Sequence, residues 1–297
     1  MKVYCESMKL SDTLLLILLA AIWGLSFIFM RATAEDFGPI VLITIRVGTA
    51  TLILLGFLFV KKRRQEFIQY WKALFFIGLL NSALPFSFLA YASLTLNAGI
   101  LSIINALTPV FAALVAHVWL KDKMTKVQLL GMLIGFSGIT YLVWDKMNWD
   151  AVSWLPIVAA VMTTVSYGLA ANTTKKYLKE VSPITATAGT LFFATLFMMV
   201  LALFFLPDFS VIPTLSWGYA LALGALCTAF AYLLFFRLIQ NIGPSKAVSV
   251  TFIIPIFSFL WAYLLLGEVV TMRMWVATAV ILLGTGLVTG VIGAKKS

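Results

Sequence analysis

The chain is a succession of long apolar stretches separated by short polar gaps. Runs such as LLLILLAAIWGLSFIFM and VATAVILLGTGLVTGVIG show no regular alternation of apolar and polar residues, which a transmembrane β-barrel would require in segments of about ten residues. Stretches of about 20 apolar residues can cross a bilayer core of roughly 30 Å as helices. Ten such spans fit the sequence, at residues 13–30, 40–60, 74–93, 98–120, 127–144, 154–174, 183–206, 217–237, 246–266 and 274–292.

Composition supports the same interpretation. Of the 297 residues, 62% are hydrophobic and 11% are charged, and the mean hydropathy is +1.05. A water-soluble domain would carry roughly 25% charged residues. Because so few charges cannot cover a water-exposed surface, we expect an all-α integral membrane protein with ten transmembrane helices and no soluble domain.

The basic residues predict the topology. The net charge is +10, and if the spans alternate, 17 of the 21 lysines and arginines fall on one side of the membrane. The other side receives only Arg31, Lys146 and Arg273, and Arg46 lies inside a span. Loops rich in Lys and Arg stay in the cytoplasm, so the pattern predicts that both termini are cytoplasmic and fits the inner (plasma) membrane of a bacterium. The topology of the chain in the lipid bilayer thus explains the excess of basic residues, and no nucleic-acid partner is expected.

The two halves of the chain repeat. A shift of 144 residues places Trp23 on Tyr167 and Pro39 on Pro183. A shift of 146 residues matches Ser82 with Thr228, Phe86 with Tyr232, Pro109 with Pro255, Asp122 with Glu268, and Gly138 with Gly284. Each repeat contains five spans, an odd number, so the second repeat must enter the membrane from the opposite face. The sequence therefore predicts two inverted five-helix repeats, at residues 11–145 and 151–292, an arrangement typical of secondary transporters with a substrate site near the midplane.

Several long segments carry a resemblance to a known family. The first repeat contains AAIWGLSFIFM, an arginine in LITIRVGTA, and LTPVFAALVAHVWLKDKMTKVQLLGMLIGFSGI; the second closes with IIPIFSFLWAYLLLGEVVTMRMWVATAVILLGTGLV. These segments resemble the EamA branch of the drug/metabolite transporter superfamily, with two tandem modules. Asp122 departs from the pattern, because the family usually has Glu there. The resemblance implies a carrier of small metabolites, often an exporter of amino acids or related solutes.

One permanent charge falls inside a span. Arg46 lies about six residues from the end of the second span, or roughly 9 Å at helical rise. A charge within the bilayer is costly and is a functional candidate, which here could meet an anionic group of the substrate or bridge helix ends. Alternatively, the long side chain snorkels to the interface.

Two aromatic residues occupy equivalent mid-membrane positions. Trp23 and Tyr167 lie away from the interfacial belts where such residues gather. Aromatic rings that carry one hydrogen-bonding group suit a pocket for a small amphipathic solute. Ordinary packing of the two helices, with the indole N–H bonded to a backbone carbonyl, is the alternative.

Further polar side chains lie deep in spans three, four and eight, beside prolines that we expect to interrupt helices in mid-membrane. The polar residues are Asn81, Ser82, Asn105, Thr228 and Tyr232, and the prolines are Pro85, Pro109 and Pro255. Each proline frees a backbone carbonyl that a solute can use. Interhelical hydrogen bonds would explain part of the set, but its place beside the prolines favours a translocation path. With Trp23, Arg46 and Tyr167, these five polar residues form our predicted substrate-binding set.

Other features indicate helix caps and close packing. Asp122 and Glu268 follow the fourth and ninth spans, and we expect each to cap the next helix. Gly131, Gly135 and Gly138 give the fifth span a small-residue face, which predicts either close packing within the chain or a homodimer.

The sequence shows no cluster of residues typical of an enzyme active site. Cys5 and Cys227 are placed where they cannot meet, no metal-ligand spacing or Walker motif occurs, and the eleven carboxylates fall at span ends or in loops. We therefore expect no catalytic residue, cofactor or metal, and a secondary transporter, an exporter or facilitator working by alternating access. The alternatives are a proton-coupled drug/metabolite antiporter, for which His117 is the candidate proton-carrying residue, and a lipid-modifying membrane enzyme.

Overall fold

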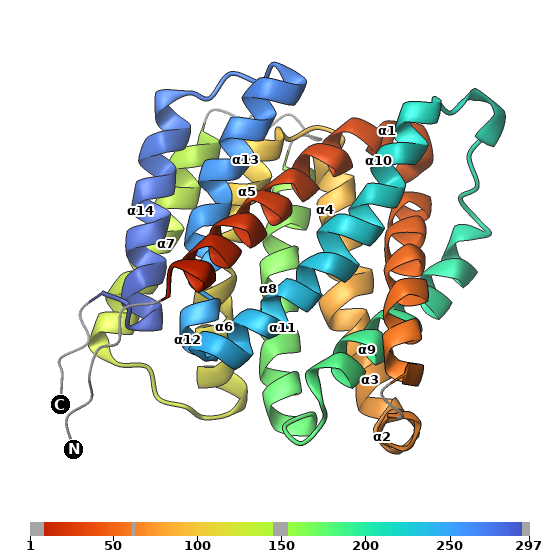
Figure 1. Cartoon of the computed structure of the whole chain (residues 1–297). Helices are drawn as coiled ribbons and strands as arrows, with labels where there is room; N and C mark the ends of the chain where they lie inside the picture. Colours follow the sequence, from red (N-terminus) through yellow and green to blue (C-terminus); the bar gives the residue numbers. More distant parts are fainter. Residues whose placement is uncertain (1–8, 61–62, 145–153, 293–297) are drawn as a thin grey trace.

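The structure, a computed structural model, describes residues 9–60, 63–144 and 154–292, and these ranges contain helices and no strand (Figure 1). The first repeat holds α1 (Leu10–Val60), α2 (Arg64–Gln69), α3 (Trp71–Gly78), the π-helical η1 (Leu79–Ala83), α4 (Leu84–Ser93), α5 (Ala98–Asn105), α6 (Thr108–Trp119) and α7 (Lys126–Val143). The second holds α8 (Leu155–Tyr177), α9 (Pro183–Ala202), the short η3 (Phe209–Val211), α10 (Thr214–Gly224), the π-helical η4 (Ala225–Phe230), α11 (Ala231–Ile242), α12 (Pro244–Ala247), α13 (Val250–Leu266) and α14 (Met272–Thr289).

These helices form ten membrane spans, as predicted. Eight are long and apolar enough to cross a bilayer, and the shorter apolar helix α13 adds another. The tenth comes from α1, whose 51 residues would extend far beyond a bilayer if straight. It bends at Gly38, where φ is 69° and ψ is 153°, a left-handed conformation that glycine adopts without steric cost. Pro39 then starts the second span, since the first turn of a helix tolerates proline.

Interruptions of the spans occur at corresponding places in the two repeats. Spans three and eight contain the π-helical segments η1 and η4, whose first residues, Leu79 and Ala225, are 146 positions apart. Span four is broken between α5 and α6, two residues before Pro109. Our expectation that Pro255 interrupts span nine was wrong, because α13 continues through it. The break in that span falls earlier, between α12 and α13.

The contacts between the repeats are themselves repeated. A Cβ atom on Gly24 would lie 2.9 Å from the backbone nitrogen of Ser258, and one on Gly168 would lie 2.9 Å from the backbone nitrogen of Ala112. Ser258 and Ala112 are equivalent under the shift of 146 residues. Helix α1 therefore packs on α13 as α8 packs on α6, which is the arrangement expected of two inverted halves. We keep 11–145 and 151–292 as the proposed limits of the repeats.

The glycine face of α7 packs within the chain. A Cβ atom on Gly284 of α14 would lie 2.5 Å from the carbonyl oxygen of Gly131 and 2.5 Å from the backbone nitrogen of Gly135. Small residues allow two backbones to approach this closely. Of the two uses predicted for this face, the structure shows close packing between α7 and α14 (Figure 1); a homodimer stays a prediction.

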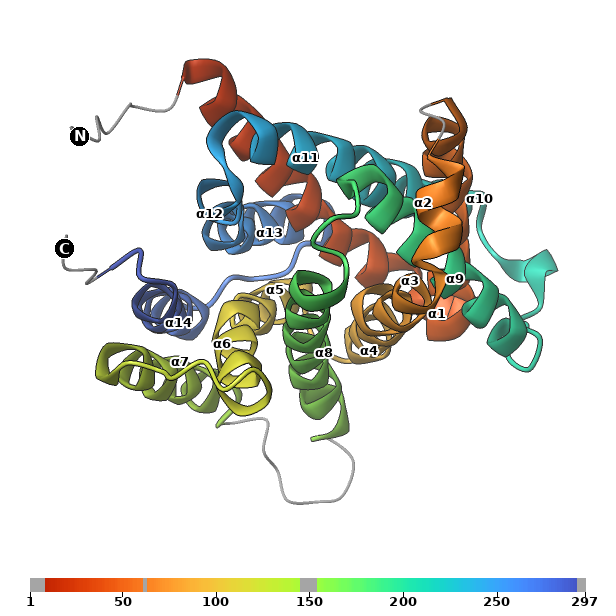
Figure 2. The ribbon, with the colours of Figure 1, turned by 90° about the horizontal axis from the view of Figure 1, so that it is seen from below.

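The molecule has two faces that bear its connections (Figure 1). The terminal face is the one where α1 begins and α14 ends, and it also carries α2 and the 120–125 connection. The distal face carries the 94–97 and 267–271 connections. Viewed from the terminal face, α1, α5, α8, α11 and α13 surround the centre of the molecule (Figure 2).

Candidate substrate-binding site

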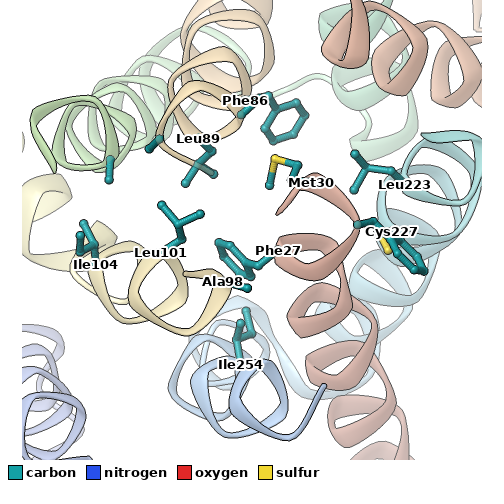
Figure 3. Close-up of a cluster of buried hydrophobic side chains, with 14 of the residues drawn as sticks. Phe27, Met30, Phe86, Leu89, Ala98, Leu101, Ile104, Leu223, Cys227 and Ile254 are labelled. Atoms are coloured by element: carbon teal, nitrogen blue, oxygen red, sulfur yellow. The ribbon is translucent and has the colours of Figure 1, made fainter. Parts of the chain in front are cut away.

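A cavity of about 300 Å³ lies between the two repeats. It is lined by Trp23, Ser26, Phe27, Met30, Arg46, Asn81, Phe86, Leu89, Asn105, Thr108, Tyr167, Ala171, Cys227, Tyr232, Phe235, Thr251 and Ile254. Figure 3 shows several of the apolar members converging from different helices, with Phe27 and Met30 on α1, Phe86 and Leu89 on α4, and Ile254 on α13. The wall is thus mostly apolar, with a few polar groups that could orient a solute.

The lining follows the internal symmetry. Both members of seven equivalent pairs contribute to it: Trp23 and Tyr167, Phe27 and Ala171, Asn81 and Cys227, Phe86 and Tyr232, Leu89 and Phe235, Asn105 and Thr251, and Thr108 and Ile254. The cavity therefore lies on the pseudo-twofold axis that relates the repeats. The residues left over are Ser26, Met30 and Arg46, and the equivalent of Arg46 is Thr190. The single charge in the wall has no counterpart in the second half.

Arg46 is held in the wall rather than extended to the membrane surface. Its residue surface is 5% exposed, so it does not snorkel. The Nε–H donates to the hydroxyl of Thr228 at 3.0 Å, Nη1 lies 3.8 Å from the sulfur of Met30, and the guanidinium lies 3.6 Å from the ring centre of Phe86. These contacts leave guanidinium N–H groups available to a ligand.

The π-helical segment η4 supplies the group that holds Arg46. Thr228 donates its hydroxyl proton to the carbonyl of Leu223 at 2.9 Å and accepts from Arg46. The equivalent of Thr228 is Ser82, and there the arrangement is incomplete. Because Thr190 replaces the arginine and donates to the carbonyl of Thr187, nothing reaches the hydroxyl of Ser82, which is buried without a partner among the described residues. Neither Ser82 nor Thr228 is part of the cavity lining, and both are buried behind it.

The other six predicted residues line the cavity together. Trp23 contacts Phe235 and Tyr232, with ring centres 5.3 and 6.4 Å apart, and the amide of Asn81 donates to the Tyr232 hydroxyl at 3.4 Å. Trp23 shows no indole hydrogen bond within the described ranges, whereas the indole of Trp261 donates to the carbonyl of Ala21 at 3.0 Å. Of the two interpretations of Trp23, lining a cavity fits this geometry better than a bonded packing residue.

Asn105 and Tyr167 complete this group of six. Tyr167 meets its neighbour Phe86 edge-on, with ring centres 6.4 Å apart. Asn105 is the last residue of α5, beside the break in span four, and its side-chain oxygen is buried without a hydrogen-bond partner among the described residues.

Sequence reasoning missed most of the apolar wall. Ser26, Phe27, Met30, Leu89, Thr108, Ala171, Phe235 and Ile254 carry no chemical signal of their own. The repeat could have found some of the others, because Thr251 is the equivalent of Asn105 and Cys227 is the equivalent of Asn81.

Two stretches, residues 11–144 and 154–290, each match the EamA-like transporter family, and together they cover almost the whole chain. The chain belongs to the EamA-like transporter family. It is therefore a multi-pass membrane transporter, and the family resemblance drawn from the sequence is confirmed.

Relatives of this EamA protein are distant in sequence but match most of its length. It is 22% identical over 282 residues to the uncharacterized transporter YoaV of Bacillus subtilis, covering 93% of this chain and 95% of the relative. It is 26% identical over 253 residues to protein PagO of Salmonella typhimurium, covering 84% and 83% of the two chains. A crystal structure of a protein with 15% identity superposes with a TM-score of 0.66 and covers 96% of this chain and 99% of the other, which supports the fold.

Equivalent residues make different hydrogen bonds at the two faces of the EamA fold. On the distal face, Arg31 of α1 donates to the carbonyls of Ser93 and Leu94 at 2.9 and 3.0 Å, and Glu268 accepts from the backbone N–H of Ala98 at 3.1 Å. These bonds join α1 to the end of α4, and the end of α13 to the start of α5. On the terminal face, the equivalent side chains, Lys175 and Asp122, make no hydrogen bond or ion pair within the part of the chain that the structure describes. Other residues join the repeats there, because Asn241 donates to Asp12, and Ser182 and Thr185 donate to Glu66.

The terminal face also bears a second cavity, of about 550 Å³. Its wall includes Arg63, Arg237 and Phe236. Phe236 stacks on Tyr232 of the central cavity with ring centres 6.1 Å apart, so one aromatic pair on α11 connects the two. We call this second cavity the vestibule.

The acidic residues at the span ends do not act as predicted. The N-caps of α7 and α14 are Thr125 and Thr271, whose side chains accept from the backbone N–H groups of Gln128 and Met274. Glu268 serves the start of α5 in the other repeat instead. The expectation that Asp122 and Glu268 cap the next helix was therefore wrong, because a nearby threonine already occupies each cap.

Proposed function

We propose that this EamA protein is a secondary transporter of small amphipathic metabolites, amino acids and related solutes among them, that works by alternating access. The observation that supports this most directly is the cavity on the pseudo-twofold axis, lined by equivalent residues of both repeats. Two similar halves give two similar states, one open to each face, so that modest binding energy can exchange them. In this proposal the six lining residues Trp23, Arg46, Asn81, Asn105, Tyr167 and Tyr232 contact the solute, and Thr228 supports Arg46 from behind the wall.

The contacts made at equivalent positions of the two faces suggest the direction of loading. Arg31 and Glu268 join helix ends at the distal face, while the equivalent Lys175 and Asp122 make no such bonds at the terminal face. The excess of lysine and arginine supports a cytoplasmic location for the terminal face. A cavity that loads from the cytoplasm fits an exporter or facilitator in the inner (plasma) membrane, with both termini cytoplasmic; residues 1–8 and 293–297 lie outside the described ranges.

The chemistry of the wall supports transport without proton coupling. Among the described residues, those that line the cavity include no Asp, Glu or His, whereas proton-coupled carriers commonly use a titratable group in the membrane core. His117 lies at the terminal face, where its Nδ1 is 3.1 Å from the carbonyl of Asp122. We expect the solute to move down its own concentration gradient, or to exchange with the same solute, without coupling to protons.

Counterflow in proteoliposomes tests the proposal. Vesicles loaded with one unlabelled solute from a panel of amino acids and other small metabolites should take up the same labelled solute at zero pH gradient and zero potential. Trp23→Ala should abolish the exchange, and Tyr232→Phe should weaken affinity about two- to twelve-fold by removing one hydrogen bond. Tyr91→Phe, at an exposed tyrosine outside the cavity, is the matched control. Exchange that requires an imposed pH gradient and is lost in His117→Gln would instead indicate the proton-coupled antiporter.

A further inference from the structure

Arg46 has no protein counter-ion. Within the described residues the only ion pair is Arg31 with Glu35, and the guanidinium of Arg46 touches a hydroxyl, a sulfur and a ring. Its Nη2 has no hydrogen-bond partner there and is not among the fully enclosed polar atoms, so it opens to the cavity. Arginine cannot release its proton at accessible pH. A permanent charge in a low-dielectric wall is costly unless water or an opposite charge meets it.

The groups around Arg46 are suited to an anion and not to a cation. Tyr232 accepts the amide of Asn81, which leaves its own proton free to donate, and the hydroxyl of Tyr167 has no partner in the described part of the chain. Within residues 9–60, 63–144 and 154–292, no carboxylate lines the cavity. An ammonium group would therefore find only neutral acceptors, and the nearby guanidinium would repel it.

The rest of the wall suits a compact apolar body. Trp23, Phe27, Phe86 and Phe235 present aromatic surface, and Leu89 and Ile254 add aliphatic surface. A volume of about 300 Å³ is at the small end of ligand pockets. It admits a body of about one aromatic ring with a short chain and is too small for a lipid or a dinucleotide.

The approach from the terminal face is mixed in charge. The vestibule wall includes Arg63 and Arg237, but its Ser182 and Asn241 are hydrogen-bonded to the carboxylates of Glu66 and Asp12. Since Phe236 of the vestibule stacks on Tyr232 of the central cavity, a solute that enters the vestibule would arrive next to the site, and the selection by charge rests on the central cavity.

We infer that the cavity takes a small organic monoanion with an apolar body, its anionic group on the guanidinium of Arg46, in preference to a zwitterion or a cation of the same shape. This inference rests on the proposed transport function and narrows its substrate class. A carboxylate can accept two parallel N–H bonds from a guanidinium, and the aromatic wall then holds the body of the molecule.

A matched set of probes separates charge from shape. The full chain in detergent would be titrated with 3-phenylpropanoate, its amide, phenylalanine and phenethylamine, and with several other aromatic and aliphatic monocarboxylates, while its melting temperature is followed. We expect the carboxylate to bind about ten- to a hundredfold more tightly than the amide, the zwitterion or the amine. Equal or tighter binding of the zwitterion or the amine, or no binding of any monocarboxylate, would overturn the inference.

Variants assign the preference to Arg46. Arg46→Gln should remove the difference between carboxylate and amide, and Arg46→Lys should keep its sign with weaker binding, because a lysine retains the charge but not the planar fork. Arg64→Gln removes an exposed charge outside both cavities and should change nothing. If Arg46→Gln does not fold, the inference is still tested by Arg46→Lys and by the comparison of the four probes on the wild-type protein. Failure of the transport proposal is seen separately, as no counterflow for any solute in the panel.

Discussion

Glu268 accepts a hydrogen bond of 3.1 Å from the backbone N–H of Ala98, and the equivalent pair in the other repeat, Asp122 and Pro244, cannot form this bond because proline has no N–H. One interaction that joins a helix end to a helix start is thus available at the distal face and chemically impossible at the terminal face. The difference follows directly from the sequence, and under the proposed alternating access we expect it to favour a state closed on the distal side.

Glu268→Ala should loosen the distal face. Loss of an N-terminal capping group costs about 1 kcal/mol, which corresponds to about a fivefold change between two states. In a Cys5→Ser background, Cys227 in the cavity wall serves as the probe. Labelling of Cys227 by an impermeant thiol reagent from the distal side should rise about fivefold, and Asp122→Ala should leave it unchanged. Equal labelling in wild type and Glu268→Ala would contradict the closing role.

Gly284→Ala should separate α7 from α14. The added methyl group would lie 2.5 Å from the carbonyl oxygen of Gly131, which is backbone and cannot rotate away. Overpacking of this kind costs typically 1–3 kcal/mol, so the melting temperature in detergent should fall. The control is Gly218→Ala, in α10, where a Cβ atom meets nothing within 4 Å. A fall of equal size in both variants would show that the close approach is not the cause.

The spans and their inverted repeat could be predicted because each depends on an average over many residues. Apolar length and the side of the basic loops tolerate errors at single positions. Local backbone geometry does not average in this way. The bend at Gly38 merges two spans without a loop, and the π-helical segments have no residue signature. Backbone geometry also differs between equivalent prolines. Pro109 follows the break between α5 and α6, whereas Pro255 lies inside the continuous helix α13.

The candidate site was predictable only where a residue type is unusual for its depth. Arg46, Trp23 and Asn81 are conspicuous in an apolar span and do line the cavity, whereas Phe27 and Leu89 look like any lipid-facing residue. Ser82 and Thr228 were both predicted as polar residues deep in a span, and the repeat makes them equivalent. The equivalence fails at their partners, where an arginine in one half corresponds to a short threonine in the other.

Glu66 should make stability depend on acid pH. Partial burial acts to raise its pKa, but the hydrogen bonds from Thr185 and Ser182 outweigh it, and the pKa of Glu66 lies below its ordinary value of 4.5. A carboxylate with a lowered pKa contributes stability that is present above about pH 4.5 and is lost as the pH falls through the lowered value. Glu66→Gln should therefore lower the melting temperature at neutral pH, and the gap to wild type should close in acid.

The control for Glu66 is Glu180→Gln. Glu180 is an exposed acid two residues before Ser182, the N-cap of α9, and we expect its removal to leave the melting temperature unchanged throughout. A gap between wild type and Glu66→Gln that stays constant down to strongly acid pH would show that the charge of Glu66 is not what stabilises the start of α9.

Lys121 and Gly267 end equivalent helices in the same backbone conformation, and only one of them suits it. Their φ angles are 57° and 64°, and in each case the next residue donates its N–H to a carbonyl six residues back, from Asp122 to Ala116 and from Glu268 to Ala262. A residue with a Cβ atom in this left-handed conformation is disfavoured by about 1 kcal/mol relative to glycine. Lys121→Gly should therefore raise the free energy of unfolding by up to about 1 kcal/mol, and Gly267→Ala should lower it by a similar amount, measured by denaturation in mixed micelles. Lys121→Ala removes the same charge but keeps the Cβ atom, so it should bring no gain; a gain as large as that of Lys121→Gly would show that the charge, and not the backbone, is the source of the strain.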